Sequence, residues 1–320
     1  MNKKLGLVGA GNIGGTLGLL AALAEYQEIA LFDVKPGLAK GKALDLGQAA
    51  ALHGSSSRIT GSDSFAILED CDCVVVTAGS PRLPGMSRDD LLSVNAKVMQ
   101  SVGQAIAQYC PGAFVICVTN PLDAMVYLLQ HASKIPDHRI VGMAGILDSA
   151  RFRYFLSDYF KTGVQNIHAL VLGGHGDTMV PLVRHTLVDG ISLEKHVELG
   201  RLPAADLEAI IQRTRQGGGE IVALLQTGSA FIAPARSAFE MVQAHLRDEK
   251  KLLPVAAKVT VEFNVPQPMF LGVPVILGAK GVEKIIQYEF TEQEQQGLTN
   301  SAAAVASLIE DMHRLGFLSE

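Results

Sequence analysis

Short apolar runs alternate with helix-forming stretches through the first half of the chain. The apolar runs are hydrophobic throughout, which is typical of strands buried on both faces of a parallel sheet. They cover residues 4–8, 29–32, 73–77, 114–119 and 140–143. Helical patterns lie between several of them, including residues 13–24 and 88–109. This alternation indicates right-handed βαβ units, so the pattern predicts an α/β fold with a doubly wound parallel sheet.

The second half of the chain has a different pattern. Runs at 169–172 and 178–183 flank a Gly-Gly-His-Gly-Asp turn, and a helical stretch follows at 204–225. Three runs broken by Gly and Pro then predict antiparallel strands, at 259–263, 269–274 and 285–288.

The chain closes with a predicted helix. Thr291 and Glu294 match a capping box at its start. Five apolar residues then share one helix face: Leu298, Ala302, Val305, Ile309 and Met312. We therefore expect a C-terminal α+β domain over residues 146–320, packed with the first domain, 1–145, into one compact body.

Composition and charge narrow the class of protein. Hydrophobic residues make up 48% of the 320 residues and charged residues 18%, which is enough for a buried core. The net charge is -5 with no basic tract, whereas nucleic-acid binding needs clustered Lys and Arg. The apolar run at 17–24 follows a glycine cluster and is too short to span a bilayer. We expect a soluble protein without a nucleic-acid or membrane partner.

The four cysteines are Cys71, Cys73, Cys110 and Cys117. Cys71 and Cys73 are two positions apart, and no second Cys/His cluster lies at zinc spacing, so we expect no metal site. We interpret the cysteines as reduced, mostly buried thiols of a cytoplasmic protein.

A glycine-rich turn follows the first predicted strand and opens a helix. It consists of Gly9, Ala10, Gly11, Asn12, Ile13 and Gly14. Glycines permit a tight turn and a close approach to a pyrophosphate, and the helix N-terminus supplies N–H donors. Asp33 ends the next strand, as the dinucleotide fingerprint requires. Its carboxylate should accept hydrogen bonds from ribose and repel a 2′-phosphate, which favours NAD over NADP.

Polar residues follow the ends of later strands, where α/β sheets bind ligands. A loop at 78–88 carries Arg82 and Arg88, with glycines that suit a closing lid. Asn120 directly follows the run at 114–119. Taken singly, a solvated loop and an Asn-Pro turn explain these features as well.

Two further motifs concern proton exchange and carboxylate binding. Asp148 and Arg151 are three residues apart and share a helix face, which an intrahelical ion pair would also explain. His175 lies between glycines, a setting that offers the ring to a ligand, and histidine exchanges a proton near neutral pH. A plain loop histidine is the alternative.

Together these motifs resemble the lactate/malate dehydrogenase superfamily, and within it the group of malate dehydrogenases that are similar to lactate dehydrogenases. The resemblance covers nearly the whole chain, in the order GAGNIGG, AGSPRLPGMSRDDLL, VTNPLD, LDSARFR, GGHGD, TGSAFIAPA and LGVPVILGAKGVEKI. It implies an NAD-binding Rossmann domain over residues 1–145 and a catalytic domain over 146–320.

The resemblance also implies roles for single residues. His175 would be the general acid and base, held by Asp148. Arg151 would clamp the substrate carboxylate, Arg88 would polarise the carbonyl, and Asn120 would orient the substrate. The cofactor would contact residues 9–14 and 33, together with Asn95, Val118, Thr119 and Asn120. A cis peptide is expected between Asn120 and Pro121.

The implied reaction is reversible, NAD-dependent oxidation of (S)-malate to oxaloacetate, a step of the tricarboxylic acid cycle, by a homo-oligomer, with a tetramer favoured over a dimer. A lactate or other 2-hydroxy-acid dehydrogenase is the alternative. Lactate dehydrogenases resemble the chain here but carry an uncharged residue where Arg82 stands. A non-catalytic dinucleotide-binding protein is disfavoured because His175, Asp148 and Arg151 are all present.

Overall fold

The structure is a computed structural model that describes residues 3–81, 86–260 and 262–318. In this part of the chain a nine-stranded sheet has the order β14-β13-β12-β6-β5-β4-β1-β2-β3. Its strands are β1 (Lys4–Val8), β2 (Glu28–Phe32), β3 (Arg58–Ser62), β4 (Cys73–Val76), β5 (Phe114–Cys117), β6 (Ile140–Gly142), β12 (Lys251–Val259), β13 (Met269–Gly278) and β14 (Gly281–Ile285).

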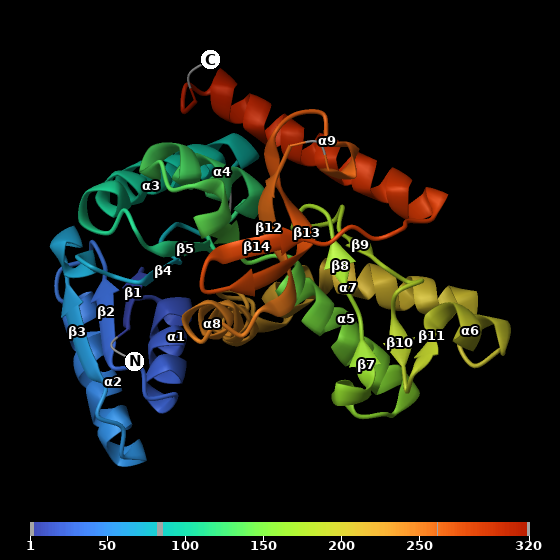
Figure 1. The fold of residues 1–320 in the computed structure, drawn as a ribbon, viewed down its shortest axis with the longest axis horizontal. Helices are drawn as coiled ribbons and strands as arrows, with labels where there is room; N and C mark the ends of the chain where they lie inside the picture. The colour runs from blue at the N-terminus through green and yellow to red at the C-terminus, as the bar shows by residue number, and fades with distance from the viewer. Residues whose placement is uncertain (1–2, 82–85, 261, 319–320) are drawn as a thin grey trace.

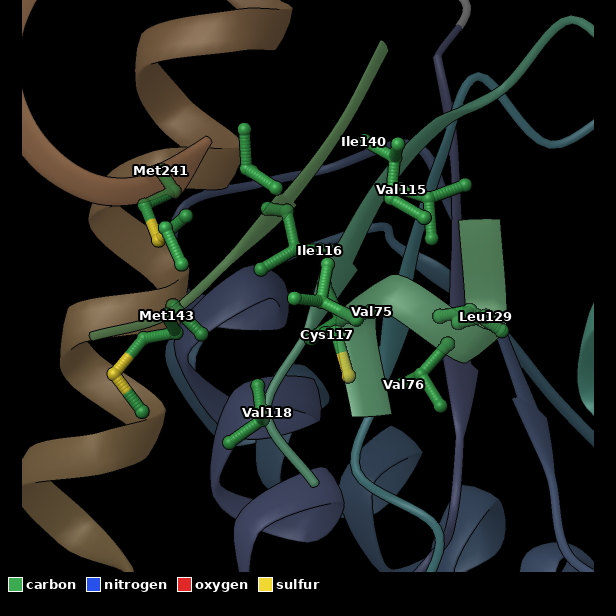
Figure 2. Close-up of a cluster of buried hydrophobic side chains, with 14 of the residues drawn as sticks. Val75, Val76, Val115, Ile116, Cys117, Val118, Leu129, Ile140, Met143 and Met241 are labelled. Atoms are coloured by element: carbon green, nitrogen blue, oxygen red, sulfur yellow. The ribbon is translucent and has the colours of Figure 1, made fainter. Parts of the chain in front are cut away.

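The first six strands pair in parallel, so the doubly wound prediction is confirmed. Every residue of β4 and β5 is buried, as expected for central strands covered on both faces. Helices lie on the two faces of this sheet, with α3 and α4 on one and α1 and α8 on the other (Figure 1). Figure 2 shows side chains from neighbouring strands, such as Val75, Val115 and Ile140, in one apolar cluster with helix residues such as Leu129 and Met241.

The helices agree closely with the sequence patterns where a prediction was made. They are α1 (Asn12–Leu23), α2 (Leu38–His53), α3 (Arg88–Tyr109), α4 (Leu122–Ser133), α5 (Gly145–Phe160), α6 (Leu193–Glu198), α7 (Ala204–Leu225), α8 (Ile232–Leu246) and α9 (Glu292–Arg314). The capping box of α9 is present, because Thr291 Oγ1 accepts the Glu294 N–H and the Glu294 carboxylate accepts the Thr291 N–H. The five apolar residues predicted for its inner face are all buried.

Antiparallel strands from the second half extend the same sheet. β12 pairs with β6 at Ala256 and Gly142, and β13 and β14 follow. Five short strands lie outside this sheet: β7 (Ile167–His168), β8 (Val171–Leu172), β9 (Val180–Pro181), β10 (Leu187–Val188) and β11 (Ile191–Ser192). The main apolar core is continuous across position 145, since it contains residues from both halves.

The predicted strand at 259–263 is wrong, because β12 runs from Lys251 to Val259 and a 3-10 turn follows at Glu262–Asn264. Pro254 makes this segment look like a break in the sequence. Proline is tolerated there because β12 meets β6 only at Ala256, so the Pro254 position has no ladder partner on that side. The prediction of a strand at 285–288 is also wrong in its position, because β14 covers Gly281–Ile285 and residues 286–288 are not part of a strand.

The thiols of Cys71, Cys73, Cys110 and Cys117 are free and buried, as predicted. Burial raises the pKa of Cys71 to about 12 and that of Cys110 to about 11. Within the described ranges, no helix is both long and apolar enough to cross a bilayer.

Candidate active site

The glycine-rich turn between β1 and α1 is closed by contacts that leave no space for side chains at two positions. Gly9 has a φ of +102°, and a Cβ there would lie 2.8 Å from the Ala78 nitrogen. A Cβ on Gly14 would lie 1.9 Å from the Gly9 carbonyl oxygen. At Gly11, in contrast, a Cβ would meet no described atom within 4 Å. The turn therefore leaves a backbone-lined cradle in front of the α1 N-terminus, which suits a pyrophosphate.

Asp33 lies at the end of β2, directly beside this turn. Its Oδ2 accepts the Ala10 N–H at 2.8 Å and its Oδ1 accepts the Lys35 N–H at 2.9 Å. The side chain is thus fixed next to the cradle. Carboxylate oxygens can accept more than one hydrogen bond, so both retain capacity for ribose hydroxyls. The glycine cradle and this carboxylate fit a dinucleotide.

Asn95 of α3 links the start of the 78–88 loop to the end of β5. Its Oδ1 accepts the Ser80 N–H at 2.8 Å, while its Nδ2 donates to the Ser80 oxygen at 3.1 Å and to the Asn120 oxygen at 2.7 Å. Thr119 adds a hydrogen bond to the Ala78 carbonyl at 2.7 Å. The side chain of Asn95 is buried, and its hydrogen bonds hold these two segments together.

The Asn120–Pro121 peptide is cis, as predicted. Val118, Asn120 and His175 line a cavity of about 820 Å³ together with Ile13 and Arg151. The sheet end and the second half of the chain thus contribute to one site, as the strand-end argument predicts. Arg215 of α7 lines the same cavity and was missed, because a single arginine in a helical stretch carries no sequence signal.

One expected residue is not brought into this group. Arg88 is the first residue of α3 and is exposed, and it does not line the cavity described above. Arg82 lies outside the described residues.

His175 and Asp148 are hydrogen-bonded, as predicted. Nδ1 of His175 lies 2.8 Å from Oδ2 of Asp148, in the first turn of α5. An ionised carboxylate only accepts hydrogen bonds, so Nδ1 donates and Nε2 is the acceptor in the neutral ring. The other oxygen of Asp148 accepts a hydrogen bond from Arg151 at 3.2 Å, so the intrahelical ion pair is also present.

The electrostatics of this group favour a protonated ring. Burial lowers the pKa of His175, but the charge and hydrogen bond of Asp148, with a further contribution from Asp123, outweigh burial and the net pKa is raised. The Asp148 side chain is 2% exposed, whereas those of His175 and Arg151 are 15% exposed. The carboxylate is therefore enclosed, while the imidazole and the guanidinium reach the cavity.

Sequence reasoning missed the residues that hold the histidine loop. Gly173 exchanges two backbone hydrogen bonds with Gly272 of β13, at 2.8 and 3.0 Å. The Gly174 N–H donates to Ser301 Oγ of α9 at 2.7 Å, and the His175 N–H donates to Asp123 Oδ2 of α4 at 2.9 Å. Asp123 lies in the motif VTNPLD and Gly272 in the motif LGVPVILGAKGVEKI, and these motifs were the available signal, whereas Ser301 lies in none of the motifs named above.

The fold and this site define a class of protein. Residues 3–142 match the family model for the lactate/malate dehydrogenase NAD-binding domain, and residues 146–315 match the model for the α/β C-terminal domain of the same family. The chain therefore belongs to the lactate/malate dehydrogenase family of NAD-dependent oxidoreductases.

Particular relatives narrow the comparison. The chain is 52% identical to a malate dehydrogenase of Methylobacterium radiotolerans over 308 residues, 96% of each sequence. Its structure matches that of Cryptosporidium parvum malate dehydrogenase with a TM-score of 0.95 at 44% identity, covering 98% of this chain and 100% of that one. A lactate dehydrogenase of Eimeria maxima with NADH and oxamate matches with a TM-score of 0.95 at 39% identity, covering 100% and 97%.

The glycine turn yields a test of the packing argument. Gly14→Ala should lower the free energy of unfolding by roughly 1–3 kcal/mol, because its methyl group meets backbone that cannot move alone. Gly11→Ala is the matched control and should change it by less than about 0.5 kcal/mol. Denaturant unfolding of the cofactor-free proteins measures both, and equal stabilities of the two variants would contradict the argument.

Proposed function

We propose that the chain is an NAD-dependent malate dehydrogenase, which interconverts (S)-malate and oxaloacetate. The observation that carries the proposal is the group formed by His175, Asp148 and Arg151 at one cavity beside the dinucleotide cradle. The group unites a proton-exchanging ring with a cation for a carboxylate, as a 2-hydroxy acid requires. The malate dehydrogenases among the relatives support the choice of substrate.

Residues 1–145 would hold the cofactor. Backbone groups of residues 9–14 would bind the pyrophosphate, and Asp33 would accept hydrogen bonds from a ribose. Its charge favours NAD over NADP, because a 2′-phosphate would lie beside a carboxylate. Val118, Thr119 and Asn120 would border the nicotinamide, with Asn95 supporting them from beneath. When bound, the nicotinamide accepts or supplies the hydride at C2 of the substrate.

Residues 146–320 would supply the groups that move the proton. In the oxidation direction, Nε2 of neutral His175 accepts the hydroxyl proton of malate. Asp148 keeps the hydrogen on Nδ1 and stabilises the imidazolium that forms. Arg151 binds the carboxylate next to the reacting carbon through its planar guanidinium. Asn120 orients the substrate oxygen, and Arg88 stabilises the developing carbonyl.

Replacing the histidine tests this assignment. His175→Asn should lower kcat by about 10²–10⁴-fold, because it removes general acid–base catalysis. NADH binding, measured by fluorescence titration, should change little, since the residues assigned to the pyrophosphate and the ribose are unchanged. A variant that retains more than about a tenth of the wild-type rate would contradict the assigned role.

Substrate choice depends on the second carboxylate of oxaloacetate, which pyruvate lacks. An unpaired charge in a closed site costs several kcal/mol, so oxaloacetate requires a cation at that end. We assign that cation to Arg82 on the loop at 78–88. The methyl group of pyruvate would leave the arginine desolvated without a partner, and such mismatches discriminate by up to about 10⁴-fold.

The substitution Arg82→Gln should therefore shift preference from oxaloacetate towards pyruvate. The measurement is kcat/KM for both keto acids with NADH, in the wild type and in the variant. The quantity compared is the ratio of kcat/KM for oxaloacetate to kcat/KM for pyruvate. A wild type that prefers pyruvate or 2-ketoisocaproate would indicate the alternative 2-hydroxy-acid dehydrogenase. A ratio that barely changes in the variant would remove Arg82 as the determinant of specificity.

Homo-oligomer formation, with a tetramer favoured, has a candidate surface. Val222, Leu224 and Leu225 at the end of α7 are 44%, 76% and 50% exposed, and Ile232 at the start of α8 is 67% exposed. Burying such exposed apolar side chains against another copy of the chain would be favourable. Leu224→Glu should lower the mass measured by sedimentation equilibrium, and a wild type with the mass of a single chain would contradict self-association.

Cytoplasmic location and a place in the tricarboxylic acid cycle stay predictions.

A further inference from the structure

Asp123 is a second buried carboxylate behind the histidine. It lies in the first turn of α4 and is 3% exposed. Its Oδ2 accepts the backbone N–H of His175 at 2.9 Å, while its Oδ1 has no hydrogen-bond partner among the described residues. A buried carboxylate oxygen without a partner is costly, so its presence here calls for a role other than packing.

The groups around Asp123 come from four elements. His175 faces it from the loop after β8, and Asp148 faces it from α5. The Cys117 thiol interacts with it from β5. From α9, the neutral hydroxyl of Ser301 lies beside Gly174, near Asp123 Oδ2. The positive charge of Arg151, from α5, lowers the pKa of the same histidine. Among the described residues, the charged groups that act on His175 are the carboxylates of Asp123 and Asp148 and the guanidinium of Arg151, and Arg215 of α7 lines the same cavity.

We propose that Asp123 is a positioning residue that fixes the backbone of His175 through Oδ2 and, through its negative charge, favours the protonated form of the ring. The proposal deepens the function proposed above, because it concerns the same proton-exchanging histidine. Asp123 acts through His175 and is not assigned a contact with substrate or cofactor.

Counting charges gives the physical reason. With both carboxylates ionised, Arg151 charged and His175 neutral, the group carries a net charge of about -1, and protonation of the ring makes it neutral. Without the charge of Asp123, the same protonation would take the group from neutral to positive. Enclosed surroundings penalise net charge, so Asp123 makes proton uptake by His175 more favourable.

The ionisation of Asp123 gives this effect a defined pH range. Burial raises its pKa to about 6, although the hydrogen bond and the charge of His175 lower it in part. Above this pH the carboxylate is ionised and supports the imidazolium, and below it the support is lost. His175 and Asp123 should therefore titrate as a coupled pair.

The test measures the protonation of His175 directly. Diethyl pyrocarbonate modifies the unprotonated imidazole, so the modification rate of His175, followed by peptide mass spectrometry, rises with pH around the histidine pKa. Asp123→Asn keeps an acceptor for the His175 N–H and removes the charge, so its midpoint should lie about 1 pH unit below that of the wild type. Asp123→Ser serves the same purpose if the asparagine variant does not fold.

Ser301→Ala is the matched control, because it releases the neighbouring Gly174 N–H without changing any charge. It should alter the rate of modification but leave the midpoint where it is in the wild type. The exposed His168 is an internal reference for the reagent, and its rate of modification at a given pH should be the same in all proteins.

Three results would overturn the proposal. One is an unchanged midpoint in a folded neutral variant of Asp123. Another is an equal shift in Ser301→Ala, which would assign the effect to loop position alone. The third is a one-site curve in the wild type, since coupled groups should give a broader one. The assay needs neither cofactor nor keto acid, so its outcome is independent of whether the chain reduces oxaloacetate.

Discussion

The hydrogen bond between His175 and Asp148 is the interaction on which the rest of the site depends. A glycine-rich turn does not by itself fix the position of its histidine, because glycines allow many backbone conformations. A 2.8 Å contact with a carboxylate that is 2% exposed selects one ring orientation and one tautomer. That selection matters only if the loop is also fixed, which explains why β13, α4 and α9 each hold a different residue of it.

The sheet explains how groups so distant in sequence meet. The parallel strands end at one edge, where the glycine turn, the 78–88 loop and Asn120 follow β1, β4 and β5. The antiparallel strands continue the same sheet past β6, so Gly272 of β13 reaches Gly173 without an intervening layer. A rigid shared sheet therefore sets the spacing between the cradle and the histidine, and no separate interface between two bodies is needed.

Local patterns predicted the elements whose causes are local. Capping at Thr291 and Glu294, and an amphipathic pattern from Arg88 to Tyr109, depend on neighbours in sequence. β3 was not identified because Arg-Ile-Thr-Gly-Ser is a polar edge strand rather than an apolar run. Ser301 and Asp123 reach the histidine loop from 127 and 52 residues away, and no local spacing encodes such contacts. The contact between His175 and Asp148 was predicted through the family resemblance, since periodicity alone offered only an ion pair within the helix.

The same reasoning locates specificity in single side chains instead of in the fold. Solved malate and lactate dehydrogenases match this chain equally well in backbone, so the backbone alone cannot distinguish their substrates. In the proposed function, the group of His175, Asp148 and Arg151 would act on the hydroxyl and the adjacent carboxylate, which malate and lactate have in common. What differs between the two substrates is the far end, a carboxylate in one and a methyl group in the other. A residue that discriminates between the two substrates must therefore carry a charge and must reach that end of the substrate. It must also be able to vary without disturbing the sheet. A residue on a loop between a strand and a helix meets this last condition best.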